Sequence, residues 1–568
     1  MNVSEITEVD PITFEVVNNA LVAVCRHMAD SLRRTSYSPI IQDAADFSCA
    51  LLDADANLIS ENEGCPIHLG TLPLSVRTAV EEYGRDRLGP GDILGVNDPY
   101  RGGVHLNDIA FIAPYFADGR LVCYVANRAH WPDIGGYESS GLAGGSATEL
   151  LHEGLVVPPV KLRTAGIVND DVVNLILENV RGPRERRGDF FAQVAAVDTG
   201  LTRLAHVIVR HGLGTVEASF RAALAHGRRR MRNAIKDVPD GVYHFEDQMD
   251  DDGVGDKPIP LHVTITVSDD QLKVDYTGTG PQARGPINSA YGMTLSSTYI
   301  IVKALLDPMG PPNSGWYSDV AVVAPEGTLV NPHAGAPVFG GGVEVGPRIA
   351  DAVMGALAQA IPERVLGALY GTINSSFLSG IDPATGDHYI FNDWIPGGWG
   401  GAVDHDGVSC MIELCGNTDD IPIEIAELKY PLRYHRSELI PDSGGPGRFR
   451  GGLGTERIIE VLSDRARASI QADRTITRPW GVFGGAGGAN TRYSVVREGG
   501  AIEVVGGRRD DGSCVSAKRS FDLVKGECLR IEAAGGGGYG PPSKRDRRSL
   551  EEDVRNGYVT EAGRKSYE

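Results

Sequence analysis

Apolar residues near the start of the chain recur three or four positions apart. This spacing runs from Phe14 to Leu32, and Asp10 and Pro11 stand just before it as a helix cap and a first-turn residue. The pattern predicts a long amphipathic helix whose apolar stripe packs inward. Residues 190–238 carry a second helical pattern, in two blocks with glycines between them.

Other stretches alternate between apolar and polar residues in the manner of strands. FSCALLD at 47–53 and NLIS at 57–60 predict a hairpin, and 241–324 and 451–531 predict further strands. A further helix is expected to begin near Pro347. The order of these patterns indicates a multidomain α+β (mixed α/β) protein, with a helical N-terminal part and β-rich middle and C-terminal parts.

The stretch from Gly95 to Gly136 carries the clearest hairpin signal. Residues 109–116 and 121–126 are almost wholly apolar, and between them Asp118 and Gly119 form a pair that favours a tight turn. The sequence therefore predicts two long strands that fold back on each other at this pair.

Folding this hairpin brings Asp108 and His130 close together. A strict two-residue turn at Asp118 and Gly119 pairs Asp108 with Ala129, so that the Asp108 and His130 side chains lie diagonally and on opposite faces. A bulge or a three-residue turn sets these two residues directly opposite each other, with Cβ atoms about 5 Å apart. A shared site requires this second register.

His105 precedes Asp108 by three residues in a glycine-containing segment and can bend towards the same point. Two imidazoles and a carboxylate form a three-ligand metal site with open coordination positions, as in catalytic zinc sites and in non-haem iron or manganese sites. We therefore predict a metal site at His105, Asp108 and His130. The alternative is that both histidines are ordinary hydrogen-bonded residues at strand ends and that Asp108 caps a turn.

Three further side chains could complete the metal shell. Asp43 and Asp46 stand just before the first predicted strand, and His68 stands in an expected loop after the second. Each could equally be a loop residue without a chemical role. Asp46 is retained as a candidate fourth ligand.

Composition and charge exclude several classes of function. The chain has 54 Lys and Arg against 75 Asp and Glu, and this net charge of −21 argues against nucleic acid or an anionic membrane as a partner. Its 8 cysteines are scattered without a Cys-x-x-Cys pair, and the N-terminus lacks the basic and apolar regions of a signal peptide. We expect a cytoplasmic protein that does not span a membrane.

A chain of 568 residues is too long for one compact core, so several domains are expected. The patterns predict an N-terminal α/β domain with the metal site over 1–238 and a β-rich middle domain over 239–380 with a helix near 347–361. They predict a C-terminal β-rich domain over 381–542 and a charged tail or docking helix over 543–568.

Several long, ordered motifs extend along the chain. They are DPITFEVVNNAL, DFSCALLDADANLIS followed by PIHLGTLP, GDILGVNDPYRGGVHLNDIAFIAPYF with RAHWPDIGG, and later DSGGPGRFRGGLG, GGGGYGPP and EEDVRNGYVTEAGR. Through these motifs the chain resembles the hydantoinase B family over nearly its full length. That family includes the B-type components of ATP-dependent N-methylhydantoinases, the α subunit of acetone carboxylase, acetophenone carboxylase subunits, lactamase subunits and the C-terminal half of 5-oxoprolinases.

The resemblance implies a metal site and a partner. The family's His-x-x-Asp and following His fall here on His105, Asp108 and His130 and imply a divalent metal, namely manganese, zinc or iron, while Asp46 is matched only through DFSCA. The implied partner is a hydantoinase A-type ATPase subunit of the actin-like class, which binds ATP and phosphorylates the substrate. A hetero-oligomer such as α2β2 follows from this division, and no G-x-x-x-x-G-K-[ST] loop occurs in this chain.

The leading hypothesis is a metal-dependent subunit of an ATP-dependent amidohydrolase that opens a cyclic amide, with a water held by the metal as the nucleophile. The chain is nearer in length to the hydantoinase and lactamase members than to the acetone carboxylase subunit, which favours hydrolysis. Three alternatives remain at this stage: an ATP-dependent ketone carboxylase subunit, a non-catalytic scaffold stabilised by its metal, and an iron oxygenase.

Overall fold

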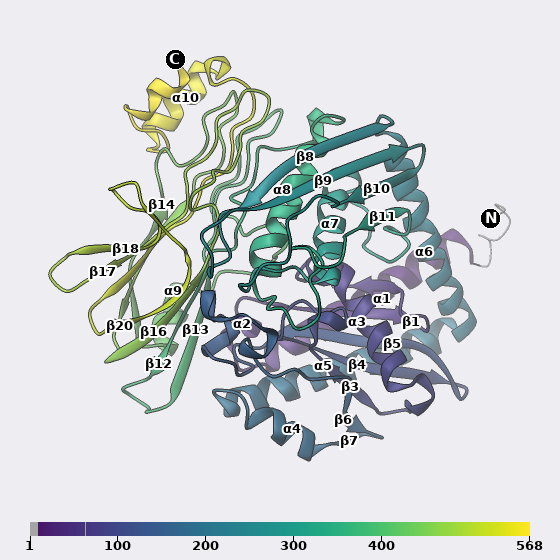
Figure 1. Cartoon of the computed structure of the whole chain (residues 1–568). Coiled ribbons are helices and arrows are strands. Elements are labelled where there is room, and N and C mark those ends of the chain that lie inside the picture. Colours follow the sequence, from purple (N-terminus) through teal and green to yellow (C-terminus); the bar gives the residue numbers. More distant parts are fainter. Residues whose placement is uncertain (1–8, 63) are drawn as a thin grey trace.

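A seven-stranded antiparallel sheet organises the N-terminal part of the molecule, with the strand order β2-β1-β5-β4-β3-β6-β7 (Figure 1). The structure is a computed structural model that describes residues 9–62 and 64–568. The strands are β1 (Phe47–Asp53), β2 (Leu58–Glu61), β3 (Ile93–Val96), β4 (Asp108–Ala117), β5 (Arg120–His130), β6 (Val160–Thr164) and β7 (Ile167–Val168).

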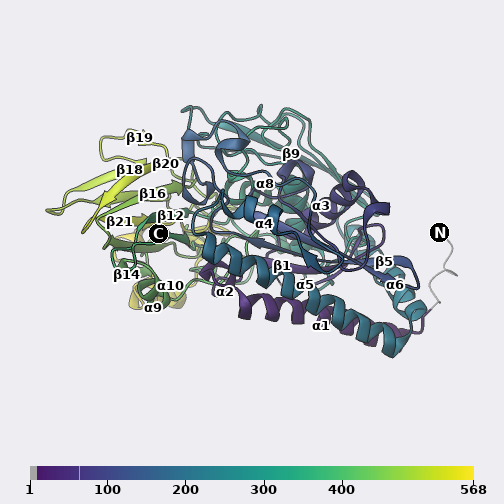
Figure 2. The same cartoon turned by 90° about the horizontal axis from the view of Figure 1, so that it is seen from below.

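Helices cover both faces of this sheet. On one face lie α1 (Pro11–Thr35), α5 (Pro183–His211) and α6 (Leu213–Lys236), whose apolar side chains share a core with β1 and β5 (Figure 2). On the other face lies α3 (His68–Tyr83). The short helices α2 (Pro39–Gln42) and α4 (Asp170–Leu177) complete this part. The predicted first helix is confirmed, and the Asp10 side chain accepts hydrogen bonds from the backbone N–H groups of Ile12 and Thr13.

A four-stranded sheet forms the centre of the middle part, in the order β11-β10-β9-β8. Its strands are β8 (Gly241–Met249), β9 (Ile259–Ser268), β10 (Gln271–Asp275) and β11 (Val320–Val323). They pack against α8 (Gly346–Leu357), which follows a π-helical turn at Gly341–Val345. The predicted helix near Pro347 is present, and it ends at Leu357 where the sequence predicted an end near residue 361.

The sequence patterns missed the helix α7 (Tyr291–Leu306), which lies within a stretch expected to form strands. This helix is buried between α3 and α8 and so has no polar stripe to produce a helical period. Its buried hydroxyls are satisfied locally: Thr294 Oγ1 donates to the Val330 carbonyl at 2.6 Å and Ser296 Oγ donates to the Ile67 carbonyl at 2.6 Å.

Two antiparallel sheets form most of the C-terminal part and share one apolar core. The first contains β12 (Ser375–Ile381), β13 (His388–Trp394), β16 (Arg465–Gln471) and β20 (Lys518–Val524). The second contains β14 (Leu432–Leu439), β15 (Thr455–Val461), β17 (Arg492–Val496), β18 (Ile502–Arg508), β19 (Cys514–Val515) and β21 (Cys528–Glu532). The helices α9 (Ile423–Lys429) and α10 (Arg547–Arg555) accompany them, and α10 lies in the charged tail (Figure 1).

Glycine-rich segments from four parts of the chain run side by side as extended backbone. They are residues 397–401, 444–454, 481–488 and 533–540. Gly401 N–H donates to the Gly537 carbonyl at 2.9 Å, and Gly445 N–H donates to the Gly536 carbonyl at 2.8 Å. A Cβ atom on Gly536 would lie 2.1 Å from the Trp399 carbonyl oxygen. Glycine is therefore required because neighbouring backbones occupy the space of a side chain.

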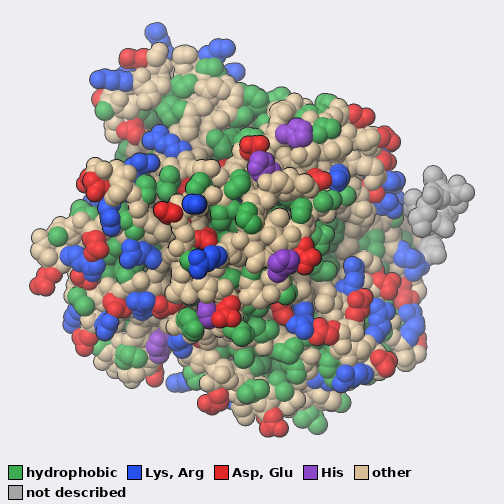
Figure 3. Space-filling model, in the orientation of Figure 1, with side chains coloured by type: hydrophobic (Ala, Val, Ile, Leu, Met, Phe, Trp, Pro, Cys, Tyr) green, Lys and Arg blue, Asp and Glu red, His purple; other side chains and the backbone are tan. Residues whose placement is uncertain are grey.

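The fold class predicted from the sequence is confirmed: helices and four sheets form a mixed α+β architecture with β-rich middle and C-terminal parts. The domain boundaries at 238, 380 and 542 stay predictions. Among residues 9–62 and 64–568, no helix combines the length and the apolar character needed to cross a bilayer. On the face shown in Figure 3, positive and negative side chains are interspersed.

Replacing Gly536 by alanine tests the close packing of the glycine segments. We expect Gly536→Ala to lower the free energy of unfolding by about 3 kcal/mol, because the backbone must shift to admit the methyl group. The measurement is the midpoint of thermal unfolding. Gly214→Ala is the matched control, since a Cβ there meets nothing within 4 Å and alanine favours the helix. An equal midpoint for the two variants would contradict this account.

Candidate metal centre

The β4–β5 hairpin sets the register on which the site depends. Asp118 and Gly119 form the turn with φ of 50° and 76°, the left-handed conformations of a tight hairpin. The register shifts between Tyr115 and Phe116, and from there to the open end of the ribbon Asp108 lies directly opposite His130. The bulged register required by the metal hypothesis is therefore present.

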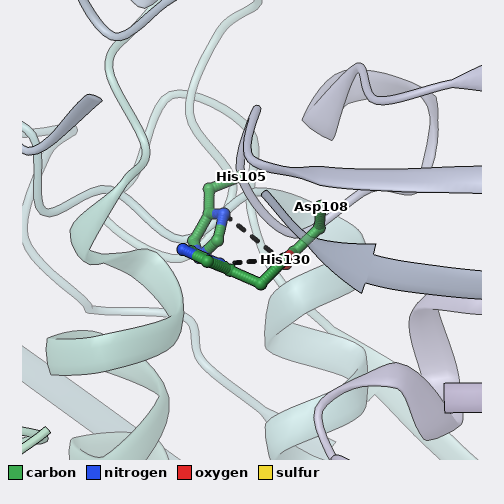
Figure 4. Close-up of side chains that lie close together, drawn as sticks. All are labelled: His105, Asp108 and His130. Carbon is green, nitrogen blue, oxygen red and sulfur yellow. Dashed lines mark hydrogen bonds and ion pairs between the residues drawn. The ribbon is translucent and has the colours of Figure 1, made fainter. Parts of the chain in front are cut away.

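Three side chains converge where the two strands open. His105 lies in the turn before β4, and its carbonyl accepts the Asp108 N–H at 3.1 Å. Asp108 Oδ1 lies 3.2 Å from His130 Nδ1, and Asp108 Oδ2 lies 3.5 Å from His105 Nδ1 (Figure 4). One possible ligand atom from each residue lies within 4.8 Å of the others. The carboxylate thus stands between two imidazoles.

The polar atoms of these side chains are buried and incompletely paired. His105, Asp108 and His130 are 5%, 3% and 1% exposed. Within the described residues, His105 Nδ1 and His130 Nε2 have no hydrogen-bond partner. A buried polar atom without a partner costs about 1–3 kcal/mol, and such atoms in native structures indicate an ion or a water. Two imidazole nitrogens and a carboxylate oxygen suit a divalent transition metal.

The electrostatic environment favours an ionised Asp108 carboxylate between the His105 and His130 imidazoles. Burial lowers the pKa of His105 to about 4. Burial also opposes the His130 cation, yet the hydrogen bond to Asp108 and the nearby Asp46 raise the pKa of His130. Although burial opposes its charge, the His105 and His130 imidazoles hold the pKa of Asp108 well below its usual range. The Asp108 carboxylate is therefore the anionic group that a cation would meet between the two imidazoles.

Asp46 and His68 lie next to this group, whereas Asp43 does not line the same cavity. Asp46 Oδ2 is 3.9 Å from His130 Nδ1, and burial raises the pKa of Asp46 to about 6. His68 Nε2 is 3.9 Å from Asp108 Oδ2. His68 was expected in a loop but begins α3. Pro73 inside that helix conceals the helical pattern, because proline usually ends or kinks a helix.

Aromatic rings support the two histidines. The His105 ring stacks on Phe339 with ring centres 4.9 Å apart and planes 7° apart. The His130 ring meets Trp394 edge-on at 5.8 Å. Phe339 is held by Glu153, whose buried carboxylate accepts the N–H groups of Val338 at 3.1 Å and Phe339 at 2.9 Å. Sequence reasoning missed Glu153, because nothing in the local pattern marks this residue as buried.

The glycine- and serine-rich stretch 135–154 contributes no residue to the cavity lining. It packs against the segment before α8 instead: Glu153 binds residues 338 and 339, and Leu150 N–H donates to the Gly335 carbonyl at 2.8 Å. Its effect on the site is therefore indirect, through the position of Phe339.

A small cavity of about 40 Å³ opens in front of the three side chains. The histidines and aspartates form one wall. Most of the remaining lining is apolar, and this apolar wall comes from several parts of the chain: Ile67, Val104, Val343, Ile373, Trp394 and Ile412. None of the described residues that line the cavity is Lys or Arg. The lining therefore favours an uncharged, largely apolar group beside the candidate ligands.

Comparison with known proteins places this geometry in a family. A sequence profile of the hydantoinase B/oxoprolinase family matches residues 10–542. The chain belongs to this family. The resemblance found in the motifs is thereby confirmed, and membership in a family of hydantoinase and oxoprolinase enzymes supports an enzymatic role for this hydantoinase B family member.

Full-length relatives agree with this assignment. The chain is 32% identical over 574 residues to a putative D-/L-hydantoinase component of the B type from Pseudomonas sp. (strain NS671), covering 98% of this chain and 94% of that protein. It is 34% identical over 560 residues to the beta chain of caprolactamase from Pseudomonas jessenii, covering 97% and 94%.

Solved structures share the fold. The crystal structure of the ATP-dependent caprolactamase from Pseudomonas jessenii matches with a TM-score of 0.87 and 30% identity, covering 98% of this chain and 96% of that chain. A nucleotide-free acetone carboxylase structure matches with a TM-score of 0.87 at 21% identity, covering 99% and 79%. The second likeness is one of fold alone.

Replacing Glu153 by alanine tests whether this residue fixes the backbone at Val338 and Phe339, next to His105. Glu153→Ala leaves two buried N–H groups without an acceptor, so we expect the free energy of unfolding to fall by about 3 kcal/mol. The measurement is thermal unfolding. Glu149→Ala is the matched control, because the Glu149 side chain is 59% exposed and surface changes cost about 0.5 kcal/mol or less. Equal loss in both variants would show that Glu153 has no special role in holding this segment.

Proposed function

We propose that this hydantoinase B family member is the metal-dependent subunit of an ATP-dependent amidohydrolase that opens a cyclic amide. The observation that carries the proposal is the convergence of His105, Asp108 and His130 on a buried cavity whose imidazole nitrogens lack partners. The full-length likeness to an ATP-dependent caprolactamase supports the reaction class.

In this proposal His105, Asp108 and His130 hold a divalent metal, either manganese, zinc or iron, and Asp46 is a possible fourth ligand. A metal bound here would polarise the amide carbonyl and lower the pKa of a water molecule. The aromatic contacts of the two histidines fix the orientation of their rings, in the way that outer residues orient metal ligands.

The apolar wall suits the substrate that we propose. The methylene carbons of a lactam ring can lie against Ile67, Ile373 and Trp394 while the amide faces the histidines. A charged ring substituent would be buried against this wall without a cation from the chain, which is costly. An uncharged cyclic amide therefore fits better than an anionic ring.

We assign ATP to a partner, a hydantoinase A-type ATPase subunit in a hetero-oligomer such as α2β2. The chain has no G-x-x-x-x-G-K-[ST] loop, and its relative from Pseudomonas jessenii is named as the beta chain of its enzyme. Phosphoryl transfer from ATP would supply the driving force for opening an amide that water alone attacks slowly. The eight cysteines are all free, as suits the cytoplasm, which we propose as the compartment.

The direct test is an assay of the complex purified with its ATPase subunit. With ATP and ε-caprolactam or a hydantoin, we expect a ring-opened amino acid or carbamoyl product together with ADP. The assay is repeated with isotopically labelled bicarbonate to test the carboxylase alternative. Labelled carbon in the product of a ketone, with no ring opening of any cyclic amide, would refute the hydrolase proposal.

Replacing Asp108 by asparagine tests the metal site. Asp108→Asn removes the negative charge between the imidazoles, so we expect metal affinity to fall about 100-fold or more. Metal content after dialysis is measured by elemental analysis. Asp118→Asn is the matched control, because Asp118 lies exposed in the turn of the same hairpin. Full metal content in Asp108→Asn would contradict the ligand assignment, and intact assembly with lost turnover would exclude the scaffold alternative.

A further inference from the structure

His68 is a buried histidine that faces the candidate metal centre without joining the three-residue group. It begins α3 and is 1% exposed. His68 lines the cavity, and its Nε2 atom lies 3.9 Å from Asp108 Oδ2 and has no hydrogen-bond partner among the described residues. The side chains whose ligand atoms all lie within 4.8 Å of one another do not include His68. His68 is thus a buried base that lies at the edge of the candidate metal centre.

The hydrogen bonds of His68 determine which ring nitrogen carries the proton. His68 Nδ1 lies 2.8 Å from Ser48 Oγ, on β1. Ser48 Oγ donates its single hydrogen to the Cys65 carbonyl at 3.3 Å. With this hydrogen engaged by Cys65, the Ser48 oxygen accepts from His68 Nδ1–H. This arrangement corresponds to the Nδ1–H tautomer, in which Nε2 presents a lone pair to the cavity.

The surroundings keep this ring in place. The backbone before α3 is fixed by Ser296, whose Oγ donates to the Ile67 carbonyl at 2.6 Å. Thr71 Oγ1 donates to the same carbonyl at 3.0 Å. Ser48 lies on a central strand, opposite Arg128 of β5. Both partners of the His68–Ser48 hydrogen bond therefore belong to rigid elements, which is the arrangement that a precisely oriented base requires.

We propose that His68 is the residue that accepts the hydrogen bond and then the proton of the attacking water, and that it is not a metal ligand. This inference rests on the proposed function, because it assigns a proton acceptor to the same cavity. Ser48 acts as a positioning residue that holds the imidazole in the required tautomer. In this division of roles, His105, Asp108 and His130 bind the metal, and His68 accepts the proton.

The proton and electron pairs balance along this route for a ring amide that the partner has phosphorylated on its oxygen, so that its carbon is doubly bonded to the ring nitrogen. The water oxygen forms a bond to that carbon, its proton moves to His68 Nε2, and the carbon–nitrogen π pair moves onto the nitrogen, which takes the proton from Nε2. The new hydroxyl then becomes a carbonyl as the carbon–nitrogen bond breaks, and its proton passes through Nε2 to the nitrogen, which leaves as the free amine. The acyl phosphate that remains is hydrolysed by a second water to the carboxylate and phosphate, and His68 is returned to its starting tautomer.

Two substitutions at one position separate the roles of the ring nitrogens. His68→Asn keeps a side-chain N–H near the Nδ1 position for Ser48 and removes the acceptor at Nε2. His68→Gln places a polar atom near the Nε2 position and gives up the contact with Ser48. Each is compared with wild type in the purified complex, with ε-caprolactam as the probe substrate and metal content measured on the same samples.

For His68→Asn we expect kcat to fall about 100-fold or more, with KM within about twofold of wild type and with unchanged metal content and thermal midpoint. We expect Ser48→Ala to lower kcat less, because the His68 ring remains and only the hydrogen bond that fixes its tautomer is removed. Loss of metal from His68→Asn would identify His68 as a ligand and overturn the proposal. So would a kcat equal to that of wild type.

A measurement without turnover keeps this inference separate from the proposed function. Ring nitrogen NMR of the histidine-labelled, zinc-loaded protein reports the His68 tautomer, and the spectrum of His68→Asn identifies its signals. We expect a protonated Nδ1 and an Nε2 that carries neither proton nor metal. The opposite tautomer or a metal-bound Nε2 would overturn the assignment of His68. Absence of ring opening of any tested cyclic amide by the wild-type complex would instead refute the proposed function.

Discussion

The bulge between Tyr115 and Phe116 is the constraint on which the rest of the site depends. Strands β4 and β5 are buried on both faces, between the α1–α5 layer and α3, so alternation of apolar and polar residues cannot fix their register. The turn and the bulge fix it instead. A slip of one residue would pair Asp108 with Ala129 and turn the His130 side chain to the opposite face of the sheet.

Bringing these side chains together lowers the stability of the folded state, and packing elsewhere in the fold offsets this loss. Several buried imidazole nitrogens lack partners, and each such atom disfavours the folded state. The opposing contributions come from distant segments, including Val343, Ile373 and Trp394, which close the cavity and bury its walls. The cavity therefore exists only when the middle and C-terminal parts pack on the N-terminal sheet.

Local signals in the sequence were sufficient for the hairpin and the cap at Asp10, and they identified His105, Asp108 and His130 as candidate ligands. The sequence could not choose between the two registers, because a bulge leaves no pattern in a strand that is apolar throughout. It also could not show α7, Glu153 or the apolar wall. Each of these depends on contacts between residues far apart in the chain, and a helix or carboxylate buried on all sides has no periodic signature.

The most direct test of the central claim is anomalous diffraction from crystals grown with manganese or zinc, recorded on both sides of the absorption edge of the metal. The account predicts one strong anomalous peak in the cavity, within bonding distance of His105, Asp108 and His130. A cavity without such a peak, or a metal bound only elsewhere on the protein, would contradict it.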